Sequence, residues 1–119
     1  MKKILIVDDS MTSRLLFKTY FPKDYTATIE EANSCETALA KAKELNPDMI
    51  FLDYNMPGRH GIDIAQALID AGITAKLILC TANLQAKVVD TAKKLGFSAI
   101  MEKPITTERI ISVLGQDNI

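Results

Sequence analysis

The chain has 119 residues, of which 48% are hydrophobic, and its net charge is −1. This length fits one ordinary domain, and the apolar fraction is high enough for a real core, which excludes a disordered chain. Acids and bases are mixed along the chain, so charge gives no reason to expect nucleic acid or an anionic membrane as a partner. No apolar run is long enough to cross a bilayer. We therefore expect residues 1–119 to form one globular domain.

The chain has two cysteines, Cys35 and Cys80. They show no metal-ligand spacing and no disulfide framework. The apolar run near the N-terminus is too short for a secretion signal and is closed by Asp8 and Asp9. We therefore expect a reduced, cytoplasmic setting, with Cys80 buried in an apolar run.

The first half of the chain predicts two strand–helix pairs. Residues 3–7 are a predicted strand, and within it residues 4–7 are continuously apolar, which is typical of a strand buried on both faces of a parallel sheet. Ser10 is a suitable N-cap for the following helix, which Pro22 ends. Residues 25–32 alternate apolar and polar, which indicates an edge strand, and Ser34 caps the next helix. The first helix is identified by apolar residues at helical spacing: Met11, Leu15, Leu16 and Tyr20.

The second half repeats this rhythm. Residues 48–52, 75–80 and 97–101 are predicted strands, and a loop with the turn pair Pro57-Gly58 follows the first of them. Asn83 is a candidate N-cap for the helix between the last two strands. The remaining signals for helix ends and starts in this half are Gly72, Gly96 and Thr106 or Thr107.

Strand and helix alternate about five times, which predicts a parallel sheet with helices on both faces. Right-handed crossovers then place the carboxyl end of every strand at one edge of the domain. The polar residues of interest all follow strands, so we expect them to converge there although they are far apart in sequence. They are Asp8 and Asp9 after the first strand, Asp53 after the third, Thr81 after the fourth and Lys103 after the fifth.

Asp8, Asp9 and Asp53 would repel one another at contact distance unless a counter-charge met them. Mg²⁺ prefers oxygen ligands and is usually held by carboxylates and phosphate oxygens, and a backbone carbonyl near Asn55 is a further candidate ligand. No His or Cys lies beside these acids in the sequence, which argues against zinc.

A carboxylate beside Mg²⁺ can act as a nucleophile toward phosphorus, a reaction that needs mainly positioning and charge neutralisation. Lys103 is suited to meet a phosphoryl oxygen, and the Thr81 hydroxyl can donate to another. The residues therefore predict an aspartyl-phosphate site at Asp53.

With these motifs, the chain resembles the receiver domain of bacterial two-component response regulators. The resemblance covers essentially the whole chain. It implies a flavodoxin-like, doubly wound sheet of strand order 2-1-3-4-5. The motifs that carry it are Val7-Asp8-Asp9-Ser10, the run from Leu52 to Gly58, Thr81-Ala82 and Lys103-Pro104.

The resemblance implies that Asp53 accepts a phosphoryl group from a histidine of a sensor kinase or from a small phosphodonor. It implies Mg²⁺, or Mn²⁺, as the cofactor, and catalysis only of the domain's own phosphorylation and hydrolysis. The partners are then the kinase and an unidentified protein target, without nucleic acid or membrane, and the chain is a monomer or weak dimer. By position, Asp8, Asp9, Asp53 and the Asn55 carbonyl are implied metal ligands, and Thr81, Ala82 and Lys103 are implied phosphoryl contacts.

One position departs from the family. A Tyr or Phe often lies a few residues before the Lys and turns inward when the Thr moves; here the matching residue is Ile100, and the nearest aromatic is Phe97. We therefore expect the site to be phosphorylated, and we expect the phosphorylation signal to reach the rest of the domain without the rotation of an aromatic ring at this position. The isomer of the Lys103-Pro104 bond is left open by the sequence.

Three other functions stay open at this stage. A phosphohydrolase with an aspartyl-phosphate intermediate would resemble the haloacid dehalogenase group, which carries Asp-x-Asp where this chain has adjacent aspartates. A flavin carrier would need a Ser/Thr/Gly-rich loop after the first strand. A receiver fold that signals without phosphate is kept open by Ile100. We expect no effector domain after the last helix, and therefore a stand-alone, chemotaxis-type regulator rather than one domain of a longer protein.

Overall fold

A computed structural model describes residues 2–56 and 60–117, and the predicted Pro57-Gly58 turn lies outside these ranges. Five parallel strands pair in the order β2-β1-β3-β4-β5, which confirms the expected fold class and puts β2 at an edge. The strands are β1 (Lys2–Val7), β2 (Ala27–Ala32), β3 (Met49–Asp53), β4 (Lys76–Thr81) and β5 (Ala99–Glu102). The helices are α1 (Met11–Tyr20), α2 (Cys35–Leu45), α3 (Gly61–Asp70), α4 (Ala86–Leu95) and α5 (Thr107–Asp117).

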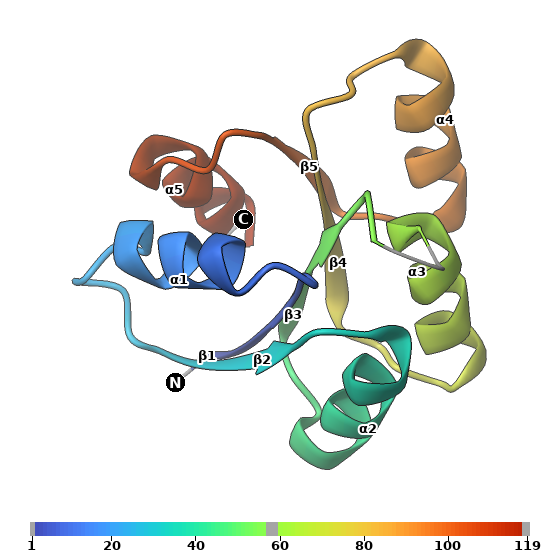
Figure 1. Ribbon diagram of the computed structural model, residues 1–119, viewed down its shortest axis with the longest axis horizontal. Coiled ribbons are helices and arrows are strands. Elements are labelled where there is room, and N and C mark those ends of the chain that lie inside the picture. Colours follow the sequence, from blue (N-terminus) through green and yellow to red (C-terminus); the bar gives the residue numbers. More distant parts are fainter. Residues whose placement is uncertain (1, 57–59, 118–119) are drawn as a thin grey trace.

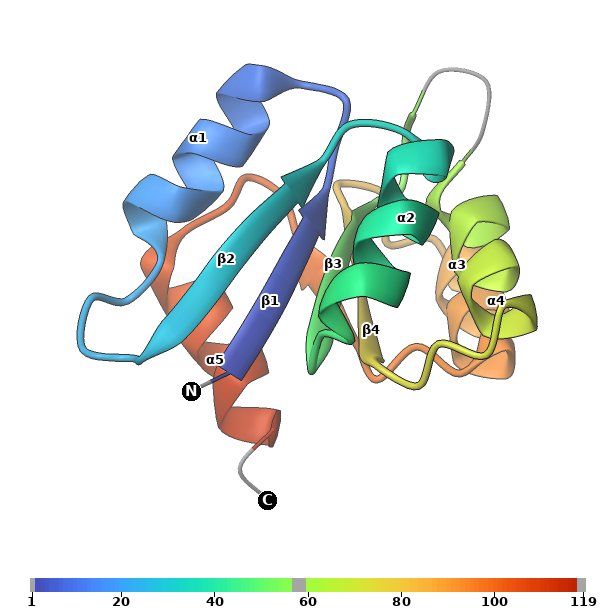
Figure 2. The ribbon, with the colours of Figure 1, turned by 90° about the horizontal axis from the view of Figure 1, so that it is seen from below.

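The sheet separates two layers of helices. Helices α1 and α5 cover one face, and α2, α3 and α4 cover the other (Figures 1 and 2). Residues 49–52 of β3 are continuously apolar because both faces of the strand are buried. Ile50 and Leu52 belong to the core under α2, α3 and α4, whereas Met49 and Phe51 belong to the core under α1 and α5. Among the described residues, no helix is both long and apolar enough to span a membrane.

The local signals for helix ends act largely as predicted. The Ser10 hydroxyl accepts a hydrogen bond from the Ser13 amide at 3.2 Å and so caps α1. Ser34 and Thr37 form a reciprocal capping box at the start of α2. At the start of α5 it is the Thr106 hydroxyl that accepts from the Arg109 amide, at 3.2 Å.

Helix α4 begins later than Asn83, so the predicted cap is wrong. The Asn83 side chain accepts from the Gln85 amide at 3.0 Å, and its own amide donates to the Thr81 hydroxyl at 2.9 Å. Asn83 is therefore held in a side-chain-bonded turn, and the helix starts after Gln85.

In helix α1 the apolar spacing correctly identifies the helix but does not mark its buried face. Phe17 is only 2% exposed, and its ring lies 4.8 Å from that of Phe51 on the sheet. The apolar residues whose spacing predicted the helix are exposed to solvent: Met11 is 74% exposed, Leu15 59%, Leu16 42% and Tyr20 41%. One aromatic side chain thus sets the orientation of the helix, and an apolar surface is left uncovered.

Candidate functional site

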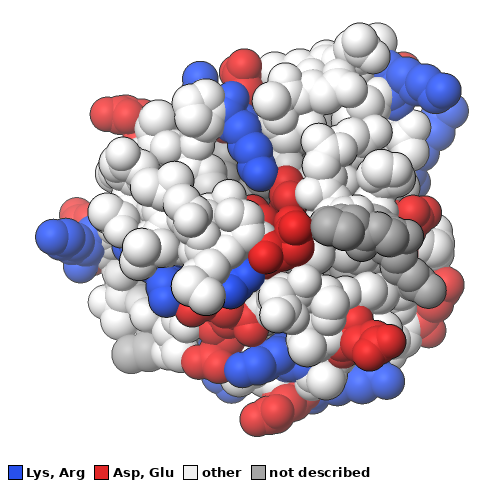
Figure 3. Space-filling model, viewed as in Figure 1, with Lys and Arg blue, Asp and Glu red and all other residues white. Residues whose placement is uncertain are grey.

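The residues predicted to converge do lie together at the carboxyl ends of the strands. Asp8 and Asp9 follow β1, Asp53 ends β3, and one ligand atom from each of these acids lies within 4.8 Å of the others. An acidic cluster is visible at the centre of the molecular face in Figure 3, where the view looks onto the ends of these strands. Asp8 and Asp53 are buried, whereas Asp9 is exposed.

Lys103 faces this cluster. Its Nζ donates to Asp53 Oδ1 at 2.7 Å and lies 3.7 Å from Asp8 Oδ2. Its amide donates to the Thr81 carbonyl at 3.0 Å, which continues the pairing of β4 with β5, and the Lys103-Pro104 peptide bond is cis. Burial alone would lower the pKa of Lys103, but the hydrogen bond to Asp53 and the charges of Asp53 and Asp8 outweigh it, so the pKa is raised. The lysine therefore stays protonated beside the acids.

The surroundings of Asp8 disfavour its ionised form. Burial raises its pKa above the usual value, and the charges of Asp53 and Asp9 add to this, against the opposing effects of the Ser10 amide and Lys103. The Ser10 amide donates to Asp8 Oδ1 at 2.9 Å. The Ser10 amide thus orients the Asp8 carboxylate, but the positive charge nearby does not fully offset the cost of ionising it. A bound cation would supply that charge.

The donor set fits a small hard cation. Carboxylate oxygens from Asp8, Asp9 and Asp53 are the ligands that Mg²⁺ and Mn²⁺ accept, and the exposure of Asp9 leaves the cluster open to water. Asn55, two residues after Asp53, is exposed at the same edge. These residues can hold a divalent ion and leave coordination positions for water or phosphate oxygens.

Thr81 and Ala82 lie at the end of β4 beside this cluster. Thr81 is only 2% exposed, and its hydroxyl accepts from the Asn83 amide at 2.9 Å. Ala82 is exposed and carries no bulky side chain that would cover the site. Behind Asp53, burial raises the pKa of Cys80 to about 12, so this thiol stays protonated and inert at neutral pH.

Gly61 and Arg14 also support the site, and our sequence analysis did not single them out. A Cβ on Gly61 would collide with the Asp53 carbonyl oxygen, and the Gly61 amide donates to the Tyr54 carbonyl at 2.9 Å. Helix α3 therefore needs glycine to approach the strand end that carries Asp53. A glycine at the first turn of a helix that follows a candidate site is the signal that could have found it.

Ile100, the position that departs from the family, is half-buried on β5. It lines a hollow of about 200 Å³ together with Ala92 and Lys93 of α4 and the residues from Phe97 to Ala99. The region where an aromatic side chain is common in the family is thus partly open between α4 and β5.

A doubly wound parallel sheet with clustered acids and a lysine at its strand ends is the arrangement of a phospho-accepting signalling switch. Residues 4–115 match the response regulator receiver domain, and the chain belongs to this family.

Relatives agree with this assignment over nearly the full chain. The chain is 33% identical over 115 residues to the chemotaxis protein CheY of Thermotoga maritima, covering 97% of this chain and 96% of that protein. It is 31% identical over 109 residues to the sporulation initiation phosphotransferase F of Bacillus subtilis, covering 92% of this chain and 87% of that protein. The solved structure of the Vibrio cholerae chemotaxis protein CheY4 superposes with a TM-score of 0.86 at 26% identity, covering 98% of both chains.

Proposed function

We propose that residues 1–119 form one receiver domain in which Asp53 accepts a phosphoryl group from a sensor histidine kinase or a small phosphodonor, with Mg²⁺ or Mn²⁺ held by Asp8, Asp9, Asp53 and the Asn55 carbonyl. The observation that carries this proposal is the position of Lys103, whose Nζ contacts Asp53 while facing Asp8. A bound divalent ion would supply charge neutralisation for the phosphoryl oxygens and the acids.

The chain's own residues account for the rest of the transfer. An Asp53 carboxylate oxygen attacks phosphorus; the new O–P bond forms as the P–N bond to the donor histidine breaks, and the departing imidazole takes up a proton. Lys103 then pairs with a phosphoryl oxygen, and the Thr81 hydroxyl, flanked by the small Ala82, donates a hydrogen bond to another phosphoryl oxygen. The domain catalyses only this transfer and the later hydrolysis of its own aspartyl phosphate.

The exposed apolar stripe of α1 supports docking of a protein donor. It begins at Met11, two residues after Asp9 in the chain, and Met11 is 74% exposed. The surface over α1 is largely free of charged side chains (Figure 3). Exposed apolar residues on the helix that follows Asp9 are suited to bind a protein that brings its phosphohistidine to Asp53 in the cytoplasm.

Phosphorylation adds about −1.5 to −2 charge at Asp53. This charge draws in Lys103 and Thr81 and biases a two-state surface around α4, β5 and α5, to which the unidentified protein target binds. Moving that surface from mostly inactive to mostly active takes on the order of 5 kcal/mol of differential stabilisation. The hollow beside Ile100 leaves room for α4 to repack without a turning aromatic ring.

The test is to incubate the protein with Mg²⁺ and acetyl phosphate and to measure its mass. We expect the wild type to gain one phosphoryl group and Asp53→Asn to gain none. A folded wild type of unchanged mass would contradict the proposal, and steady turnover of p-nitrophenyl phosphate would favour the phosphohydrolase instead.

A further inference from the structure

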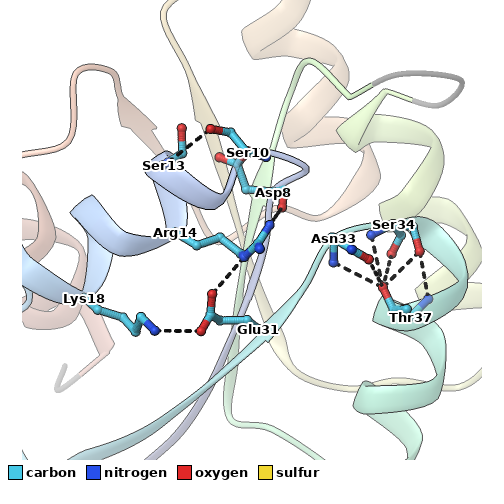
Figure 4. Close-up of polar contacts among 9 residues, drawn as sticks. All are labelled: Asp8, Ser10, Ser13, Arg14, Lys18, Glu31, Asn33, Ser34 and Thr37. Carbon is cyan, nitrogen blue, oxygen red and sulfur yellow. Dashed lines mark hydrogen bonds and ion pairs between the residues drawn. The ribbon is translucent and has the colours of Figure 1, made fainter.

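Arg14 on helix α1 makes a contact that links the acidic site to the edge strand. Its Nη1 donates to the Asp8 carbonyl oxygen at 2.7 Å, and its Nε donates to Glu31 Oε1 on β2 at 2.8 Å (Figure 4). The Arg14 side chain is only 12% exposed, and it lines the small hollow that also contains Asp8, Asp53 and Lys103. One guanidinium group therefore joins α1, the end of β1 and β2.

The Asp8 carbonyl belongs to the peptide unit that connects Asp8 to Asp9. The orientation of this unit sets the directions in which both side chains leave the backbone, because it fixes ψ of Asp8 and φ of Asp9 together. The Asp8 amide is already held by the Ala32 carbonyl of β2 at 3.0 Å. Arg14 holds the other side of Asp8, so the turn after β1 is fixed on both sides.

Glu31 pairs with Arg14 and with Lys18. Hydrogen bonds from Lys18 at 2.7 Å and from Arg14 hold the pKa of Glu31 below its usual value, so this carboxylate is ionised at neutral pH. The guanidinium bonds the backbone carbonyl of Asp8 and not its carboxylate, so it acts on Asp8 mainly through the direction of this hydrogen bond. A fork that donates from Nε and Nη1 at once is a geometry that lysine does not reproduce.

We propose that Arg14 is a positioning residue that orients the Asp8–Asp9 peptide so that both carboxylates point at the divalent ion. This inference rests on the proposed function, since it concerns the proposed metal site. Groups that orient metal ligands typically change metal affinity by about 10-fold to 100-fold when they are removed.

The experiment measures the Mg²⁺ dissociation constant by isothermal titration calorimetry for wild type, Arg14→Met and Lys18→Met. Lys18 is a matched control because it lies one turn further along α1, carries the same charge and pairs with the same Glu31 carboxylate. We expect Arg14→Met to weaken Mg²⁺ binding about 10-fold. Lys18→Met, which removes an exposed ion pair, is expected to change it by less than about twofold.

Urea unfolding without metal establishes that each variant is folded. If Arg14→Met does not fold, Arg14→Lys takes its place, and we expect it too to bind Mg²⁺ more weakly than wild type because the fork is lost. Wild-type affinity in the folded Arg14 variant, or an equal loss in Lys18→Met, would overturn the inference alone. A wild type that binds no Mg²⁺ would instead overturn the proposed metal site, and the inference with it.

Discussion

At the scale of single residues, burial and the neighbouring charges of Asp53 and Asp9 raise the pKa of Asp8 and so disfavour its ionised form. Its folded-state pKa is raised, so its favourable contribution to folding is present below the ordinary value of 3.8 and is lost as the pH rises through the raised value. At neutral pH without metal, the Asp8 charge therefore destabilises the fold. The same charge is needed once a cation binds.

Replacing Asp8 by Asn should separate these two effects. Asn keeps an oxygen that can accept from the Ser10 amide but removes the charge that faces Asp53 and Asp9. We expect Asp8→Asn to raise the urea midpoint of the metal-free protein at pH 7 and to weaken Mg²⁺ binding more than about tenfold. A lowered midpoint, with unchanged dependence on urea, would contradict this interpretation of Asp8.

Gly61 provides a test of how closely α3 approaches the site. A methyl group at this position meets the Asp53 carbonyl oxygen, so the backbone must shift or the helix must move away. We expect Gly61→Ala to lower the free energy of unfolding by about 1–3 kcal/mol and to slow phosphorylation of Asp53.

Gly115 is a matched control for this substitution. It lies in helix α5, and a Cβ there has nothing within 4 Å, so Gly115→Ala is expected to be neutral or to stabilise by up to about 1 kcal/mol. Equal effects of the two substitutions on stability would argue against the close approach at Gly61.

The acids and the lysine could be placed from sequence because each follows a strand, and parallel strands end at one edge. Gly61 and Arg14 could not be placed in this way. Their roles depend on how closely α3 and α1 approach the strand ends, which is a property of packing between elements. Their roles become visible only when the distances to Asp53 and Asp8 are known.

At the scale of elements, helix α1 shows what periodicity leaves undetermined. Its apolar stripe and Phe17 lie on different sides of the helix, and the side that packs is decided by the contact of Phe17 with Phe51. For α4, the predicted start was wrong because the Asn83 side chain is used in a turn instead of a cap. Both differences arise from contacts that spacing in the sequence does not encode.

The exposed face of α1 predicts a difference between donors. We expect Leu15→Glu to slow phosphoryl transfer from a phosphorylated histidine kinase about tenfold, because a charge would be buried in the docking surface. Phosphorylation by acetyl phosphate, which needs no such surface, is expected to stay at the wild-type rate.

Ile69→Glu on α3 serves as the comparison, because Ile69 is also exposed but lies on the opposite face of the sheet. It should leave both rates unchanged. Loss of phosphorylation by both donors in Leu15→Glu would mean that the substitution damages the site itself and would contradict a role limited to docking.

At the scale of the whole molecule, alternation of strands and helices was sufficient to predict a parallel sheet between two helical layers. The strand order 2-1-3-4-5 came from the resemblance to receiver domains, because alternation alone permits several orders. The structure confirms the order and shows its consequence, since β1 and β3 are neighbours and bring Asp8 beside Asp53.

Cation binding should therefore stabilise the whole fold. At a Mg²⁺ concentration of about 100 times the dissociation constant, mass action predicts a gain of about 2.7 kcal/mol in the free energy of unfolding. The gain should shrink as the pH falls toward the raised pKa of Asp8, because protons then compete with the ion. Urea titrations with and without Mg²⁺ at several pH values measure this, and a gain independent of pH would argue that the ion binds elsewhere.

The Thr81 hydroxyl oxygen accepts from the Asn83 amide at 2.9 Å, and the hydroxyl proton makes a long contact, 3.5 Å, with the Asn83 carbonyl. We propose that this proton turns toward a phosphoryl oxygen on Asp53 while the hydroxyl oxygen keeps its hydrogen bond from the Asn83 amide. Because the Asn83 amide is bonded to this hydroxyl, a displacement of the hydroxyl would also move the segment between Thr81 and the start of α4. The Thr81 hydroxyl would then both bind the phosphoryl group and move the start of α4. Phosphorylation would change the position of α4 even though residue 100 is not aromatic.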